Sequence, residues 1–298
     1  MILAKIGDYG GMLRALADVF RDHGPLTTMA MVFDKYELEV VPTKAEATQV
    51  GYRHMLKNLR RSFGLMDPRD LRQHHVAQYR DKRKIKAPTQ ANRELQLLSA
   101  VCTKAREWDA IDINPLLGLA KVPTEARERY VSDDEYIHAR ALATPMLGCV
   151  MDLALLTGLR RTDLLRLSRA DLTEDGILIR PSKTRRTTNV TILIQWTPAL
   201  RYVIKEALKI KPQVRQWILC NRMGKLITKN GFDSAWQRLM DKVTAKGDYD
   251  RFQFRDIRAK NASDDEDIEV ASDRLGHASQ AITKRIYMRK ARKVRPLR

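Results

Sequence analysis

Arg160 and Asp163 lie three residues apart in a stretch that is otherwise rich in leucine. Residues 146–156 have the composition of a core helix, which Gly158 is expected to end, so that Arg160 begins the next helix. Side chains at this spacing share one helix face, and the Asp163 carboxylate can hold the Arg160 guanidinium in one rotamer while its other donors reach a phosphate. A surface ion pair on an amphipathic helix would explain the two residues equally well. The spacing alone is therefore compatible with an anion site and with a surface ion pair, and it does not decide between them.

The longer motif around this pair favours the anion site. From Thr157 onward the chain reads Thr-Gly-Leu-Arg-x-x-Asp-Leu-Leu-x-Leu, which resembles the first arginine box of the tyrosine recombinases, the phage integrase family. Members of that family carry four further groups in a set order: a lysine in a β-turn, a His/Lys-x-x-Arg box, a Leu-Gly-His and a tyrosine. The sequence has a candidate for each group in that order, namely Lys183, Arg255 with Arg258, His277 and Tyr287.

These residues suit the cleavage of a phosphodiester without a metal. Two bidentate arginines and a histidine N–H, here Arg160, Arg258 and His277, can offset the charge of a pentacoordinate phosphorane. The resemblance implies that Tyr287 attacks the scissile phosphate to give a 3′-phosphotyrosyl bond, and that Lys183 protonates the departing 5′-oxygen. The sequence offers no clear carboxylate cage or Cys/His cluster, so no metal and no cofactor are expected.

Three features depart from the family pattern. Arg255 stands where most members have histidine, and an arginine cannot readily accept a proton at neutral pH, so a base role must pass to water or phosphate or become purely electrostatic. Together with the two other arginines, it is expected to favour the phenolate form of Tyr287. Tyr287 follows His277 by ten residues, one more than the family spacing, and the acidic residues 264–267 replace apolar helix.

The elements expected around these residues form an α-rich second domain. Ser132 resembles a helix N-cap followed by acidic residues and begins this domain. Two β-rich runs, residues 177–180 and 189–194, predict a hairpin whose loop holds Lys183. Helices are expected at residues 200–211 and about 230–243. The resemblance implies a catalytic domain with a small antiparallel β-sheet, the DNA breaking-rejoining enzyme fold, over residues 131–298.

Upstream, punctuation by Pro, Gly and Asp predicts four helices: residues 28–40, residues 44–63, a helix capped at Asp67, and residues 89–108. The last of these and the Asn114-Pro115 turn resemble the end of the family's core-binding domain, so a four-helix, SAM-like DNA-binding domain is expected at residues 26–118. Residues 119–130 are expected to be a linker, and residues 1–25 a lead-in too short for an arm-site-binding domain. Candidate DNA contacts, which a solvated helix face would also explain, are Arg80, Lys82, Arg83, Lys84 and Lys86.

The composition of the 298-residue chain limits the class of protein. Its formal net charge is +19, spread along the whole length, which favours a polyanion partner, although a ribosome-type or membrane-surface protein would share this charge. No apolar run approaches the roughly 18 residues of a membrane span, and the N-terminus lacks the apolar region of a signal peptide, so a cytoplasmic protein is expected. The unclustered cysteines Cys102, Cys149 and Cys220 are interpreted as small core hydrophobes.

The sequence therefore predicts a mainly α, two-domain, site-specific DNA recombinase of the phage or prophage integrase type. Its expected partners are double-stranded DNA with specific attachment sites and three further copies of the chain in a homotetramer, with accessory DNA-bending or directionality proteins as further candidates. Two alternatives remain. A type IB topoisomerase-like nicking and closing enzyme would use the same residues, and a catalytically impaired DNA-binding relative would explain Arg255 and the extra residue before Tyr287.

Overall fold

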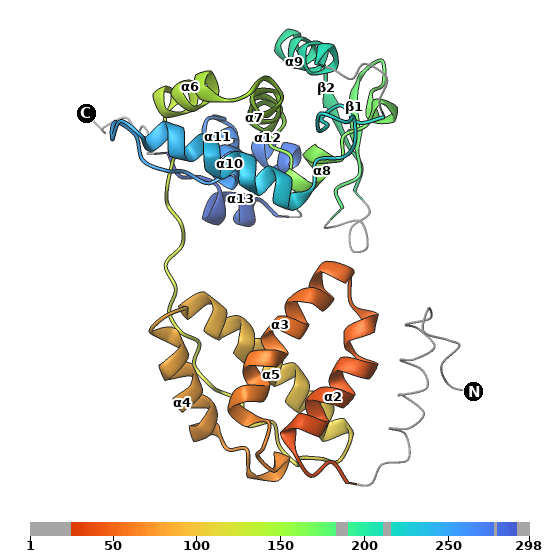
Figure 1. Ribbon diagram of the computed structural model, residues 1–298, viewed down its shortest axis with the longest axis vertical. Helices are drawn as coiled ribbons and strands as arrows, with labels where there is room; N and C mark the ends of the chain where they lie inside the picture. Colours follow the sequence, from red (N-terminus) through yellow and green to blue (C-terminus); the bar gives the residue numbers. More distant parts are fainter. Residues whose placement is uncertain (1–24, 183–189, 211–215, 277–278, 291–298) are drawn as a thin grey trace. The chain divides into compact units, whose positions relative to one another are not determined.

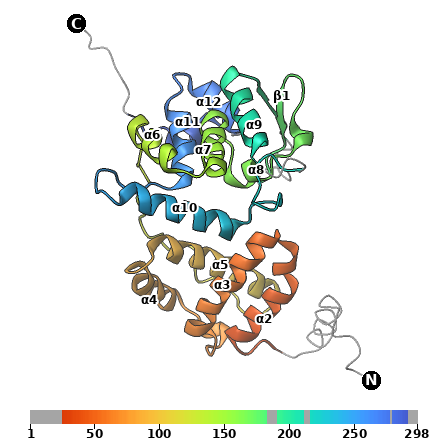
Figure 2. The same cartoon turned by 45° about the horizontal axis from the view of Figure 1, so that its top comes forward.

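The computed structural model of the chain describes residues 25–182, 190–210, 216–276 and 279–290. The chain divides into two compact units, residues 1–125 and 126–298, whose elements are labelled in Figure 1 and seen from a second direction in Figure 2. The boundary between the units lies inside the stretch 119–130. The described residues are mainly helical and include a small antiparallel sheet in the second unit, which confirms the predicted fold class.

The first unit packs its helices around one apolar core. Its described α-helices are α2 (Met29–Glu39), α3 (Glu46–Phe63), α4 (Gln73–Lys84) and α5 (Pro88–Glu107). Their inward faces bury a shared set of side chains that includes Met29, Phe33, Leu56, Leu59 and Leu98. One boundary differs from the sequence prediction, because the Asp67 carboxylate accepts the Arg69 N–H and caps a short 3-10 turn, Pro68–Asp70. Helix α4 begins only after that turn.

The second unit is built around α11 (Phe254–Ser263), in which every residue except Arg255 is buried. The other described helices are α6 (Asp133–Leu142), α7 (Pro145–Thr157), α8 (Arg161–Leu165), α9 (Pro198–Lys209), α10 (Lys229–Thr244), α12 (Ile268–Leu275) and α13 (Gln280–Ile286). Apolar side chains from α7, α10 and α11 form the centre of its core, among them Leu153, Phe232, Trp236 and Ile257. Figure 1 shows α11 and α10 running beneath α6 and α7.

The sheet consists of β1 (Gly176–Ile179) and β2 (Ile192–Gln195), which pair antiparallel with Ile177 opposite Ile194. Ile177 and Ile179 are buried, and the intervening Leu178 points to the exposed face, as the two-residue repeat of a strand requires. The predicted hairpin is therefore present. The centre of its loop, residues 183–189, lies outside the described residues.

Two helices of the second unit end at glycines in the left-handed conformation, where a side chain would be strained. Gly158 ends α7 and Gly276 ends α12, each with φ of 62°. A Cβ on Gly158 would also lie 2.4 Å from the Asn261 Oδ1 atom, so the approach of α7 to α11 requires this glycine. At the start of the unit, Ser132 is the N-cap of α6, as predicted, and it forms a capping box with Glu135.

The three cysteines are buried, as predicted for core hydrophobes. No helix among the described residues combines the length and the apolar composition that a membrane span would require.

Candidate active site

Arg258 lies at the centre of the candidate site and joins the ends of two helices. Its side chain is 7% exposed and extends from α11. One guanidinium nitrogen donates to the Gly158 carbonyl at the end of α7, and another donates to the Leu275 carbonyl at the end of α12, at 2.9 Å. Helix C-termini carry partial negative charge, which suits a guanidinium at both positions. The carbonyls therefore fix the orientation of Arg258.

The surroundings of Arg258 contain the other predicted charges. Burial is the largest cause that lowers the pKa of Arg258 from its ordinary value, and the positive charge of Arg160 lowers it further. Tyr287 and the carboxylate of Asp163 act in the opposite direction. Because charges act on a pKa only over short distances in a protein, Arg160, Asp163 and Tyr287 all lie near this guanidinium. The structure brings these four residues together.

Arg160 occupies the N-cap position of the short helix α8, without a side-chain capping bond, two residues after the left-handed Gly158. Its side chain is half-buried, and within the described part of the chain it forms no hydrogen bond or ion pair. The sequence predicts that Asp163 holds Arg160, but the buried Asp163 carboxylate accepts the Ser182 N–H instead, at 3.0 Å. Asp163 therefore fixes the start of the hairpin loop rather than the arginine, because the chain folds back from β1 onto α8.

Tyr287 follows α13 and is half-buried against α11 and α12. Its ring packs on Ala262, Ala271 and Leu275, and the Arg258 guanidinium carbon lies 5.3 Å from the ring centroid. A side-chain hydrogen bond also joins Tyr287 to Arg258. The tyrosine thus lies beside the central arginine of the site, in the same protomer.

Of the other predicted site residues, Arg255 lies within the described residues, whereas Lys183 and His277 do not. Arg255 lies in the first turn of α11 and is exposed, whereas Arg258, one turn later, is buried. The described neighbours of Lys183 and His277 are Ser182, which Asp163 holds, and Gly276, which ends α12.

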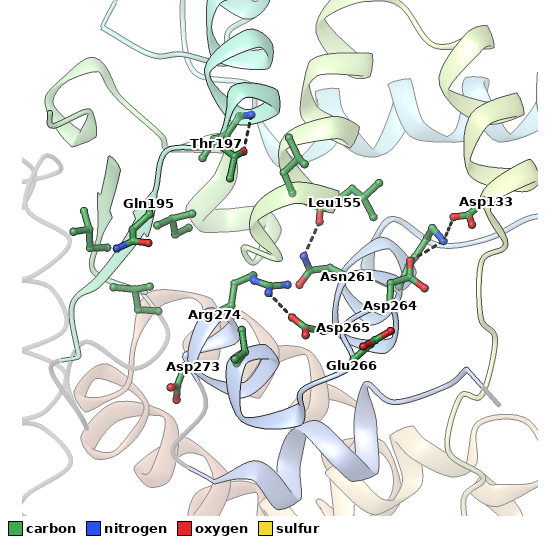
Figure 3. A pocket seen from close by; sticks show the side chains of 17 residues that line it. Asp133, Leu155, Gln195, Thr197, Asn261, Asp264, Asp265, Glu266, Asp273 and Arg274 are labelled. Atoms are coloured by element: carbon green, nitrogen blue, oxygen red, sulfur yellow. Dashed lines mark hydrogen bonds and ion pairs between the residues drawn. The ribbon is translucent and has the colours of Figure 1, made fainter. Parts of the chain in front are cut away.

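A groove with a volume of about 1050 Å³ lies next to the site, between β2, α12 and the end of α7 (Figure 3). The buried Lys260 forms ion pairs beside it with Asp133 and with Asp264, the latter at 2.8 Å. Burial alone would lower the pKa of Lys260, but these carboxylates outweigh it and raise the pKa. Asn261 donates to the Leu155 carbonyl at 2.6 Å and joins α11 to α7. The Asn261 bond thus holds α11 in register with α7, the helix that precedes Arg160, and Lys260 joins α11 to the start of α6.

The predicted DNA contacts in the first unit divide into two groups. Arg83 binds the fully buried Glu94 through two hydrogen bonds of 2.8 and 3.1 Å, and Arg80 and Lys84 pair with Asp81. The exposed Lys82 and Lys86 form no ion pair with another described residue. The internal role of Arg83 could not be read from its helix position alone, since its partner lies on the next helix.

Sequence reasoning missed a set of residues that surrounds Asp256. This carboxylate has no exposed side-chain surface and binds two arginines, Arg127 and Arg289, which flank α11 from distant parts of the chain. The only local signal was the spacing of Gln253 and Asp256, which matches the capping box that the structure forms there. The arginine partners lie 129 and 33 residues away in sequence, beyond the reach of any local pattern.

No group of three or more His, Cys, Asp or Glu side chains in the described ranges is arranged to hold a metal ion. The site that the structure assembles from described residues consists of two arginines, a carboxylate and a tyrosine.

Comparison with known proteins agrees with this geometry. The sequence model of the phage integrase family matches residues 132–293. Among solved structures, lambda integrase (residues 75–356) in a dimer bound to a COC′ core site superposes with a TM-score of 0.77 at 18% identity, over 91% of this chain and 99% of that chain. A lambda integrase tetramer bound to a Holliday junction gives the same TM-score and identity, over 95% of this chain and 83% of that chain.

The Tn1549 transposon integrase in complex with circular intermediate DNA is also similar, with a TM-score of 0.70 at 14% identity, over 90% of this chain and 96% of that chain. No curated protein sequence matches the chain. At these identities the structural likeness establishes a shared fold, while the family match covers more than half of the 298 residues. The chain belongs to the phage integrase family and is a site-specific DNA recombinase of the tyrosine type.

Proposed function

We propose that this recombinase cleaves and rejoins duplex DNA through a 3′-phosphotyrosyl intermediate formed on Tyr287. The observation that carries the proposal is the contact between Tyr287 and the buried Arg258, with Arg160 in electrostatic range of the same guanidinium. A phosphate that bridges the two arginines would lie next to the tyrosine hydroxyl, which is the arrangement that in-line attack requires.

In the proposed reaction, the Tyr287 oxygen forms a bond to the scissile phosphorus while the bond from phosphorus to the 5′-oxygen breaks. The tyrosine proton passes to water, and Lys183 gives a proton to the departing 5′-oxygen. Rejoining is the reverse attack by a 5′-hydroxyl, so the phosphotyrosyl bond conserves the energy of the phosphodiester.

Arg160, Arg258 and His277 stabilise the phosphorane in this proposal. Asp163 has a supporting role, because it holds Ser182 next to Lys183 and so restrains the loop that carries the general acid. Arg255 contributes positive charge near the DNA rather than acting as a base.

For the whole chain, we propose that residues 26–118 form the core-binding domain, that residues 119–130 are the linker and that residues 131–298 form the catalytic domain. Lys82 and Lys86 are the best candidates for phosphate contacts in the basic cluster, since Arg80, Arg83 and Lys84 already pair within the fold. The proposed assembly is a homotetramer on two attachment sites, as in the lambda integrase tetramer on a Holliday junction, with accessory DNA-bending or directionality proteins. We place this prophage-type enzyme in the cytoplasm, where its DNA substrate lies.

The test uses a Tyr287→Phe variant first to select a binding site from random-sequence duplexes, because this variant should bind DNA without becoming trapped on it. The wild-type protein is then incubated, without added metal, with a nicked form of the selected duplex. Cleavage of this duplex releases a short fragment that bears the free 5′-hydroxyl, so rejoining is prevented. A denaturing gel should show a protein–DNA adduct whose peptide map contains Tyr287. Tight binding by the wild type without an adduct would instead favour the impaired DNA-binding relative.

A further inference from the structure

The chain that follows Tyr287 is fastened to α11 by two polar groups. The Ser263 hydroxyl donates to the Tyr287 carbonyl at 2.7 Å and accepts the Arg289 N–H at the same distance. The Arg289 side chain, only 8% exposed, donates to Asp256 at 2.8 Å and to the Arg129 carbonyl at 3.0 Å. The backbone on both sides of the Tyr287–Arg289 turn is therefore restrained.

Asp256 is shared with the chain that connects the two units. The Arg127 guanidinium donates to both carboxylate oxygens, with bonds of 2.9 and 2.7 Å, and the Gln253 N–H donates to the carboxylate at 2.8 Å. Burial alone would raise the pKa of Asp256, but the bonds from Arg127, Gln253 and Arg289 outweigh it and lower the pKa. Asp256 is thus a charged group at neutral pH that binds Arg127 on one side and Arg289 on the other.

A second cluster, centred on Asp264 at the C-terminal end of α11, also links residues near Arg127 to residues near Arg289. Asp264 pairs with Lys290 at 3.1 Å and accepts a hydrogen bond from the Tyr130 hydroxyl. The ammonium groups of Lys290 and Lys260 lie 5.7 and 5.0 Å from the centroid of the Tyr130 ring. Residues 127–130 and residues 287–290 are therefore joined at both ends of α11.

These contacts lie close to the reacting groups in sequence. Asp256 precedes Arg258 by two residues on α11, and Arg289 follows Tyr287 by two residues. Arg127 lies just after the boundary between the units, at the start of the second unit. A shift of this connecting chain would move Asp256, because the bidentate Arg127 pair resists sliding. The single bond from Arg289 to Asp256 would pass this shift to the turn that carries Tyr287.

We propose that Arg127, Asp256 and Arg289 form a positioning network through which the chain connecting the two units sets the position of the Tyr287 hydroxyl. The inference rests on the proposed function of Tyr287 as the nucleophile. Arg127 does not contact the reacting atoms, so its role is to hold Asp256 and Arg289 in the geometry that in-line attack needs. Binding of DNA to both units would then be coupled to cleavage through this network.

The experiment measures single-turnover adduct formation by the full chain on the nicked duplex selected above, at saturating DNA. The variants are Arg127→Gln, Arg127→Lys and Arg289→Gln. The matched control is Arg251→Gln, because Arg251 is also an ion-paired arginine of the second unit, bound to Asp241 at 2.6 Å on the surface. Three quantities are recorded for each protein: the rate constant for adduct formation, the final amplitude and the dissociation constant for the duplex.

We expect Arg127→Gln and Arg289→Gln to lower the rate constant about tenfold or more, since small displacements of a nucleophile have effects of this size. The dissociation constant should change less than about twofold, because neither side chain is assigned to a phosphate. Arg127→Lys should restore part of the rate, since it retains the charge but loses the bidentate geometry. Arg251→Gln should match the wild type.

A purely structural role would give a different result, because misfolded molecules lower the amplitude while the folded remainder cleaves at the normal rate. A normal rate constant in Arg127→Gln, whatever its amplitude, would overturn the positioning network and leave the nucleophile assignment intact. If Arg127→Gln does not fold, a normal rate constant in Arg127→Lys, which keeps the charge, overturns it equally. Adduct formation by Tyr287→Phe would overturn the proposed nucleophile, and the network with it.

Discussion

Glu94 in the first unit and Asp256 in the second are both fully buried carboxylates that bind arginine, yet their partners differ in kind. Glu94 accepts bonds from Asn58, Tyr79 and Arg83, which belong to the helices α3 and α4 of the same small bundle. Asp256 binds the start of the second unit and the turn after Tyr287. A buried carboxylate joins the helices of one bundle in the first unit, whereas in the proposed network a similar carboxylate positions the turn that carries Tyr287.

Asp256→Asn should have the largest effect. If it lowered stability alone, the proposed difference between Asp256 and Glu94 would disappear. The amide leaves two arginines without their carboxylate, and breaking a buried pair in this way costs about 3 kcal/mol or more of unfolding free energy. Cleavage at saturating DNA should slow by about tenfold or more in the molecules that remain folded. Urea unfolding and single-turnover adduct formation measure the two effects separately.

Glu94→Gln is the matched change in the first unit and should have a smaller effect on stability. Only one arginine loses its carboxylate, and the Arg83 side chain is 31% exposed and can turn toward water, so we expect a loss of about 2 kcal/mol. The rate constant for adduct formation should stay at the wild-type value at a temperature where the variant is folded. A slowed rate constant with full amplitude would remove the distinction between the two carboxylates.

Acid should reduce the stabilisation that both carboxylates, Glu94 and Asp256, give to the fold. Burial alone would raise the pKa of Glu94, but the bonds from Arg83, Asn58 and Tyr79 outweigh it and lower the pKa, as happens at Asp256. A carboxyl group whose pKa is lowered by folding stabilises the fold above its unfolded-state pKa of about 4, and this stabilisation is lost as the pH falls through the lower, folded-state value.

The thermal midpoint should therefore change little between about pH 7 and 5 on account of these groups, and should fall below about pH 4.5. Glu94→Gln and Asp256→Asn should each show a shallower acid dependence than the wild type, because each variant takes up one proton fewer on unfolding. An unchanged acid slope in either variant would mean that its carboxylate is not the group that titrates. Calorimetry across this pH range makes the measurement.

The two units also show how far the sequence could be read. The helices around Arg160 and Arg258 followed from local patterns, because caps, helix-ending glycines and apolar periodicity act over a few residues. The family and its fold followed from the resemblance of the ordered motifs to the phage integrase family. The motif order also identified Tyr287, which the structure sets beside Arg258.

The sequence could not predict hydrogen-bond and ion-pair partners that come from distant parts of the chain. Asp163 was expected to hold Arg160 on the same helix, but it binds Ser182, 19 residues later, since the return of the chain from β1 decides that contact. Arg83 was grouped with the DNA contacts because its helix is basic, although Glu94 on the next helix holds it. Charge pairing across elements depends on packing, which no single-helix pattern encodes.

The smallest effects are expected for the exposed lysines of the first unit, which differ from the basic residues that form ion pairs within its fold. Lys82→Gln and Lys86→Gln remove exposed cations, so each should leave the thermal midpoint unchanged. If each lysine contacts one phosphate, each change should weaken DNA binding across all sequences and reduce the slope of log affinity against log salt by about one. Arg83→Gln is the matched change at a neighbouring position, and it should lower the thermal midpoint because Glu94 loses its cation. Titrations of a fluorescent duplex at several salt concentrations measure the slopes. A full salt slope in both lysine variants would exclude Lys82 and Lys86 from the phosphate contacts.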